Sequence, residues 1–319
     1  MASSFWEMRA FLIFVSSVFF FGTSPLLVYA ETSTGGTFSV SPLFTDISIG
    51  EGETAKDFEL SVSNGTADPV VLRLSLIDFG SLNESGGIAF LGKEANGYAL
   101  ASWIVPEKDV VTLLPGSEEK LKFTLENRES LSPGGHYGAV LFSVENEGGN
   151  QQGSPSTVSV SSTFSALIFA RKEGGILQEF SFKEQGFERY SWWSGLPMGI
   201  SLRFQNSGNV DIVPRGRAML VDPFGRVVAK GIINEDSARI LPESFRVYHL
   251  KLSPLSAYVL PGPYTVMTEY RFDGQDAFQT IPEQRVFAWG IAFWWLVGIG
   301  AISFGIRTLR RKLKSTRTL

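Results

Sequence analysis

The chain has 319 residues, of which 44% are hydrophobic and 19% charged, and its formal net charge is -4. This composition excludes a wholly disordered chain, and the length indicates about two domains. The absence of cysteine excludes disulfides, thiol nucleophiles and thiolate metal sites, and the presence of only two histidines, His136 and His249, excludes a multi-histidine metal site.

Residues 1–30 have the layout of a secretory signal peptide. Arg9 precedes an apolar run over 11–21, and Val28 and Ala30 stand at the -3 and -1 positions of a cleavage pattern. We expect cleavage after Ala30, because the apolar run is short for a bilayer span. An uncleaved anchor is the alternative, since apolar residues resume just before the cleavage pattern.

Residues 31–174 alternate apolar and polar side chains between turn signals, which is typical of half-buried antiparallel strands. The glycine-rich and polar stretch Glu145–Ser156 is predicted to be a flexible loop, and Arg171–Gly175 to be a domain boundary. The strand candidates of this region are 58–62, 72–76, 121–125, 137–144 and 158–169.

Residues 175–285 repeat the pattern, with short apolar segments separated by Gly, Pro, Asn and Asp. The candidates are 200–204, 218–221, 227–228, 245–252 and 264–270. Short strands at such spacing predict an all-β fold of two tandem immunoglobulin-like β-sandwich domains, one over 31–174 and one over 175–285. Domains of this size bury enough apolar surface to fold without disulfides.

Residues 286–306 carry no charge, and at about 1.5 Å per residue they would cross a bilayer core of about 30 Å as a helix. We therefore expect one C-terminal transmembrane helix, a basic cytoplasmic tail over 307–319, and the body outside the cytoplasm. A buried soluble helix is the alternative. The cations that set this topology are Arg307, Arg310, Arg311, Lys312, Lys314 and Arg317.

The charge of the body differs from that of the whole chain. Without Arg9, Glu7 and the six C-terminal cations, 21 basic and 31 acidic residues remain, so the body carries a net charge of -10. An acidic body repels phosphate, which argues against nucleic acid as the partner. It also argues against flat docking on an anionic membrane.

No catalytic, metal or cofactor motif is recognised in the sequence, and no catalytic residue, metal or cofactor is predicted. Gly134, Gly135, His136 and Tyr137, at the start of a strong strand, are candidate partner contacts. The alternative for His136 is a surface or satisfied residue at a strand start.

Trp192 and Trp193 are further candidate partner contacts, because one of two adjacent residues in an extended strand points away from the core. Packing between the domains is the alternative explanation for this pair.

Short motifs give a family resemblance. Phe38–Pro42, Val62–Asn64, Leu113–Gly116 and Ser132–Phe142 resemble the first domain of WxL-interacting proteins, and the second half looks like the same class of extracellular domain. The resemblance implies a bacterial surface protein with two immunoglobulin-like domains, a membrane helix and a basic tail. It also implies binding to cell-wall polymer and to surface proteins.

Three functions are compatible with these patterns. The first is a non-enzymatic binding or scaffold protein at the cell membrane that engages cell wall or surface proteins through loops and edge strands. The second is a chaperone-like assembly factor that captures strands of exported subunits at an open edge. The third is a cell-wall hydrolase, which needs a pair of carboxylates in a cleft.

Overall fold

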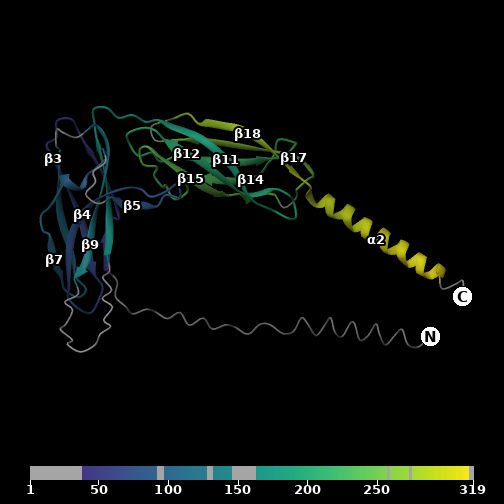
Figure 1. The fold of residues 1–319 in the computed structure, drawn as a ribbon, viewed down its shortest axis with the longest axis horizontal. Coiled ribbons are helices and arrows are strands. Elements are labelled where there is room, and N and C mark those ends of the chain that lie inside the picture. The colour runs from purple at the N-terminus through teal and green to yellow at the C-terminus, as the bar shows by residue number, and fades with distance from the viewer. Residues whose placement is uncertain are drawn as a thin grey trace. The chain divides into compact units, whose positions relative to one another are not determined.

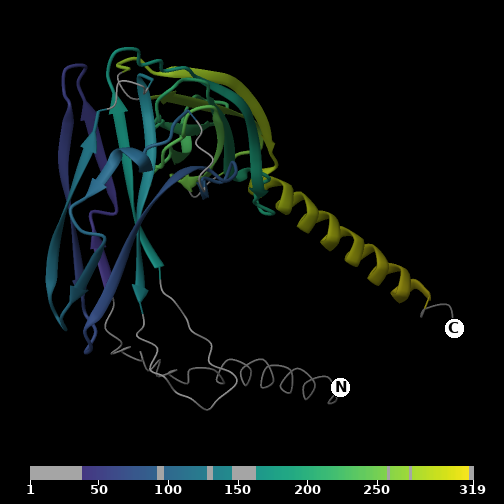
Figure 2. The ribbon, with the colours of Figure 1, turned by 60° about the vertical axis from the view of Figure 1, so that its left-hand side comes forward.

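The alternating segments form strands, which assemble into two β-sandwiches in the computed structural model (Figures 1 and 2). The structure describes residues 38–91, 97–127, 132–145, 163–256, 259–272 and 275–315. The signal-peptide prediction with Ala30, the loop residues 146–156 and Arg317 lie outside this range. Thr37–Leu319 cluster as one compact unit.

The first sandwich has the strand order of an immunoglobulin fold. One sheet has the order β1-β3-β8-β6, and the other has the order β2-β10-β9-β4-β5, with β7 also paired to β4. In immunoglobulin lettering these sheets are A-B-E-D and A′-G-F-C-C′. The strands are β1 (Phe38–Ser41), β2 (Phe44–Ile49), β3 (Ala55–Asn64), β4 (Val70–Ser81), β5 (Ile88–Leu91), β6 (Ile104–Pro106), β7 (Val110–Leu113), β8 (Glu118–Glu126), β9 (Gly134–Glu145) and β10 (Thr163–Lys172), with a 3-10 turn at Ala101–Trp103.

The second sandwich pairs β11-β12-β15 in one sheet and β16-β14-β13-β17-β18 in the other. In the same lettering the sheets are A-B-E and C′-C-F-G, with the short β16 added beside C′, so this module is also immunoglobulin-like. Its strands are β11 (Phe180–Tyr190), β12 (Pro197–Asn206), β13 (Arg215–Val221), β14 (Val227–Ile233), β15 (Ser244–Lys251), β16 (Ser253–Pro254), β17 (Gly262–Arg271) and β18 (Gln279–Ala288). In this module β11, β16 and β18 were not among the strand candidates of the sequence.

Each sandwich has its own apolar core between its sheets. Leu60 and Phe142 are fully buried in the first core, and Leu202 and Phe204 in the second. Full burial of one such side chain stabilises the fold by about 1.5–3 kcal/mol. In a chain without cysteine, this burial replaces a disulfide between the sheets.

A helix, α2 (Gly290–Ser315), continues from the end of β18 (Figure 1). It starts four residues later than the expected span 286–306, because residues 286–288 pair with β17 as the last residues of β18. Within the residues that the structure describes, no helix combines the length and the apolar character needed to cross a membrane.

Candidate functional site

The predicted contact segment Gly134–Tyr137 begins β9 and is buried. His136 is 1% exposed, and its Nδ1 and Nε2 lie 3.2 and 2.9 Å from the carbonyl oxygens of Ala99 and Ser132. Burial lowers the pKa of His136, although the two carbonyl contacts oppose this shift. The structure therefore places His136 as a satisfied interior residue.

The neighbours of His136 join the two sandwiches. The backbone N–H of Gly135 donates to the carbonyl oxygen of Asn209 at 2.7 Å, and the Tyr137 hydroxyl donates to Asp211 Oδ1 at 3.4 Å. Gly134 has a φ of +128°, and a Cβ there would lie 2.8 Å from the Asn209 oxygen. Only glycine fits this approach, so the predicted contact segment is occupied by contacts within the chain.

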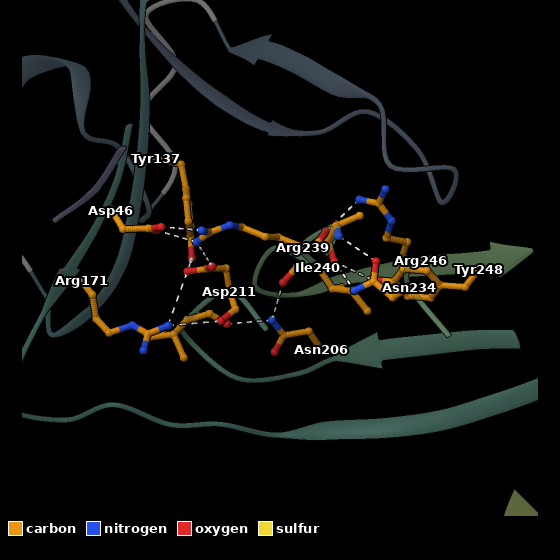
Figure 3. Close-up of polar contacts among 12 residues, drawn as sticks. Asp46, Tyr137, Arg171, Asn206, Asp211, Asn234, Arg239, Ile240, Arg246 and Tyr248 are labelled. Carbon is orange, nitrogen blue, oxygen red and sulfur yellow. Dashed lines mark hydrogen bonds and ion pairs between the residues drawn. The ribbon is translucent and has the colours of Figure 1, made fainter. Parts of the chain in front are cut away.

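A guanidinium group links acids of both sandwiches (Figure 3). Arg239 donates to Asp46 Oδ1 and Oδ2 at 2.7 and 2.6 Å, and to Asp211 Oδ2 at 2.7 Å. It also lies 4.3 Å from the centroid of the Phe169 ring. Burial opposes the charge, but the bonds to both aspartates raise the pKa of Arg239.

No sequence pattern indicates this network, because Asp46, Asp211 and Arg239 are single charged residues in separate segments. Asp46 and Asp211 also line a shallow hollow. Both aspartates accept hydrogen bonds from Arg239, so they hold that residue instead of facing a ligand as a free acid-base pair. No group of three or more metal-ligating residues occurs among the described side chains.

The β4–β5 hairpin makes a second link, extending toward β15 in both ribbon views (Figures 1 and 2). Glu84 at its tip binds Arg203 through two hydrogen bonds of 2.7 and 2.6 Å. The Glu84 carbonyl also accepts the Val247 N–H at 2.7 Å. The hydrogen bond from Arg203 lowers the pKa of Glu84, so this pair is ionic at neutral pH.

A cavity of about 430 Å³ lies beside these contacts. Phe44, Leu167 and Phe169 supply apolar walls from the first sandwich, and Arg239 and Arg246 supply cationic groups from the second. Such a lining suits an apolar side chain of a partner better than it suits acid-base chemistry.

One sheet edge of the first sandwich is open over part of its length. β9 pairs with β10 from Thr163 to Lys172, but on the opposite side β2 pairs only with Leu167–Lys172. No described strand covers this side of Thr163–Ala166. The gap arises because β1 pairs with β3 in the other sheet. The chain then crosses between the sheets and pairs with β10 only from Phe44 onward, as β2.

Trp192 and Trp193 lie in the turn between β11 and β12, which is why both can leave the core. Trp192 is 74% exposed, and Trp193 stacks on Trp294 of α2 with ring centroids 5.7 Å apart. The packing partner of this pair is thus α2, and not the first sandwich, which was the alternative weighed from sequence.

No family model and no curated protein sequence matches the chain. Among solved structures, the class 5 fimbriae chaperone CfaA is 14% identical with a TM-score of 0.42, over 77% of this chain and 100% of that one. A chain of a chaperone-tip adhesin complex of CFA/I fimbriae is 13% identical with a TM-score of 0.42, over 78% and 98% of the two chains. The E. coli chaperone DraB is 13% identical with a TM-score of 0.38, over 77% and 98%. These likenesses are weak, and the fold assignment rests on the strand order.

Proposed function

We propose that this chain is a non-enzymatic binding protein outside the cytoplasm, held at a membrane by its C-terminal segment, which captures an extended segment of a partner. The observation that carries this proposal is the open outer edge of Thr163–Ala166 in β10. An extended peptide can add to such an edge through backbone hydrogen bonds, while pockets beside the edge select its side chains.

The backbone N–H and C=O groups of β10 are oriented for strand addition at its open edge. The Leu167 N–H donates to the Leu43 carbonyl, which shows that Leu167 presents its backbone groups to the β2 side. Two residues earlier, Ser165 presents its N–H and C=O to the same side by strand alternation. The exposed side chains of Leu43 and Phe44 lie next to this edge and offer apolar contacts.

The membrane attachment rests on sequence. The run 286–306 is uncharged and six cations follow it, which is the pattern of a stop-transfer segment with a cytoplasmic C-terminus. α2 contains most of this run, and the side chains of Ile291 and Ala292 lie outside those described. The net charge of -10 on the body favours contact with the membrane through a limited region only.

The open edge favours a transiently bound, extended segment of an exported protein, as in the chaperone-like function. Stable binding to cell wall or surface proteins is the second candidate, supported by the resemblance of Ser132–Phe142 to WxL-interacting proteins. Both candidates share strand addition as the recognition step, and they differ in the identity and lifetime of the partner.

Site-specific photo-crosslinking in intact cells tests the edge. A photoreactive residue at Thr163 should capture a partner, whereas the same residue at the exposed Lys122 on the opposite sheet should not. Short-lived adducts with newly exported chains would identify an assembly factor, and lasting adducts with surface proteins or wall polymer would identify a scaffold. Equal labelling at the two positions would contradict recognition at this edge.

A pair of variants at one position tests the backbone mechanism. Ser165→Pro removes the outward N–H, whereas Ser165→Ala keeps it. We expect the proline variant to lose the Thr163 crosslink and the alanine variant to retain it, with circular dichroism showing the same strand content for both. Retention of the crosslink by a folded proline variant would show that the partner does not bind through the backbone of β10.

A further inference from the structure

Several loops of the second sandwich meet at the end where α2 begins. The Trp289 N–H donates to the Ser194 carbonyl at 3.1 Å, which ties the β11–β12 turn to the start of the helix. A Cβ at Gly262 would lie 3.2 Å from Pro223, so the β13–β14 turn reaches the same end. A Cβ at Gly290 would contact the Val259 carbonyl, which places the segment before β17 there as well.

This end of the sandwich exposes large apolar side chains from every segment that reaches it. Together they form an apolar collar around the start of α2, and its members are exposed by 44% to 74% of their surface. The collar residues are Trp192, Trp193, Phe224, Leu255, Phe287 and Trp289.

The tryptophans of the collar are held in place by α2. Trp294 Nε1 donates to the Trp193 carbonyl at 3.0 Å, and its ring is 5.5 Å from Trp192 and 5.7 Å from Trp193. Gly195 has a φ of +74°, and a Cβ there would lie 2.2 Å from Trp289 Nε1. A glycine is therefore required where the turn meets the helix. The rings of Trp192, Trp193 and Trp294 form an ordered cluster there.

The opposite end of the same sandwich has a different character. There Asn209, Asp211 and Arg239 make polar contacts with the first sandwich. The apolar collar thus occupies only the end from which the uncharged segment leaves.

We propose that the collar of the second sandwich inserts into the lipid headgroup region of the membrane and fixes the orientation of the body above the bilayer. This inference rests on the proposed membrane attachment. Tryptophan and other aromatic side chains favour this region because one part of the ring system is apolar and another is polar. Several large apolar side chains exposed at one end of a domain are otherwise unfavourable in water.

The absence of cysteine in the sequence permits a clean test with single nitroxide labels. The full chain, reconstituted in phosphatidylcholine–phosphatidylglycerol vesicles, carries the label at Phe224→Cys, which leaves the tryptophan cluster intact, or at Trp192→Cys. Ile232→Cys is the matched control, because Ile232 is an exposed apolar residue toward the far end of β14. Electron paramagnetic resonance then compares accessibility to oxygen and to a water-soluble nickel chelate.

We expect the collar labels to be accessible to oxygen and several-fold less accessible to nickel than the Ile232 label. Nickel accessibility equal to the control would overturn the inference, and shielding from both reagents would indicate a protein occupant and overturn it as well. Alkaline extraction of the same vesicles separates the two proposals. A chain that resists extraction but exposes its collar labels to nickel is attached without an inserted collar, whereas an extracted chain overturns the attachment itself.

Discussion

A buried asparagine closes the same strand in both sandwiches. Asn64 ends β3, and its Nδ2 donates to the carbonyl oxygens of Asp68 and Leu113 at 2.8 and 3.2 Å. Asn206 ends β12, and its Nδ2 donates to the carbonyls of Val210 and Ile240 at 2.7 and 3.0 Å. In both cases Oδ1 accepts the N–H two residues later. Each amide therefore satisfies backbone groups that a loop would otherwise leave unpaired.

We predict that Asn206→Asp lowers the free energy of unfolding by about 2–3 kcal/mol, because a carboxylate would face two buried carbonyl oxygens that lose their donor. Urea denaturation measures this loss. The adjacent exposed residue provides a control, and Ser207→Ala should change stability by less than about 0.5 kcal/mol. A similar stability for both variants would show that the amide is not required.

We also predict that stability falls in mild acid through His136. Burial lowers its pKa in the folded state, so the unfolded chain binds a proton first as the pH falls. The stabilisation is present above about pH 6.5 and is lost as the pH falls from there toward the folded pKa, by at most about 1.4 kcal/mol per pH unit.

Urea denaturation between pH 8 and pH 5 checks this dependence. His136→Gln should flatten the profile, because glutamine carries no group that takes up a proton over this range. A wild-type profile that is flat over this range would contradict the prediction.

The β4–β5 hairpin illustrates how one glycine sets a contact between modules. Gly86 has a φ of +88°, and a Cβ there would lie 2.1 Å from Cζ of Arg246. The close approach lets the neighbouring Glu84 reach Arg203 and Val247. The hairpin therefore depends on glycine for its backbone conformation, and a methyl group there would also displace the Arg246 guanidinium.

We predict that Gly86→Ala displaces the hairpin tip and speeds hydrogen exchange at the Val247 amide, which loses its acceptor. Mass-spectrometric exchange localised to β15 measures this change. Gly116→Ala is the matched control, since Gly116 also has a positive φ of +70° but open space around its Cβ position. Unchanged protection at Val247 in the Gly86 variant would show that the tip tolerates the methyl group.

The two sandwiches have separate cores and are joined chiefly by polar contacts that centre on Asp211. A smaller apolar cluster also lies at the junction, where Leu241 packs against a group that contains Tyr137 and Phe169. The specific polar bonds fix the relative orientation of the sandwiches, so loss of one buried acid should loosen the junction more than it unfolds either module.

We predict that Asp211→Ala broadens the distance distribution between the sandwiches, because Tyr137 loses its hydrogen-bond acceptor and Arg171 its ion-pair partner in the second module. Double electron–electron resonance between labels at Lys122→Cys and Lys230→Cys measures this distribution. Asp222→Ala removes an aspartate bonded to Arg226 within the second sandwich and should leave the distribution narrow. Equal widths for the two variants would contradict a hinge restrained by Asp211.

The sequence was sufficient for the all-β fold class because alternation and turn residues act over a few positions. Segments such as 121–125 and 264–270 became β8 and β17 for this reason. β18 was missed because its first residues, 279–285, are mostly polar and include a proline, and residues 286–288 share their apolar character with the following helix. Only pairing with β17 makes this segment a strand. The strand β11 was missed because its register with β12 contains an irregularity between Phe182 and Glu184 that disturbs the alternation.

The candidate partner contacts were likewise marked by local sequence pattern, but their contacts depend on the tertiary structure. The sequence marked Gly134–Tyr137 and the pair Trp192 and Trp193 as unusual, and both lie at contacts between distant segments. It could not say which surfaces they meet, because the ends of strands from different modules come together only after both sheets have formed. The sequence alone determined strands, turns and the uncharged C-terminal segment, which depend on local pattern. Only the tertiary structure decided that Asp211 joins the modules, that β10 has an open edge and that the tryptophans gather beside α2, because each depends on long-range pairing.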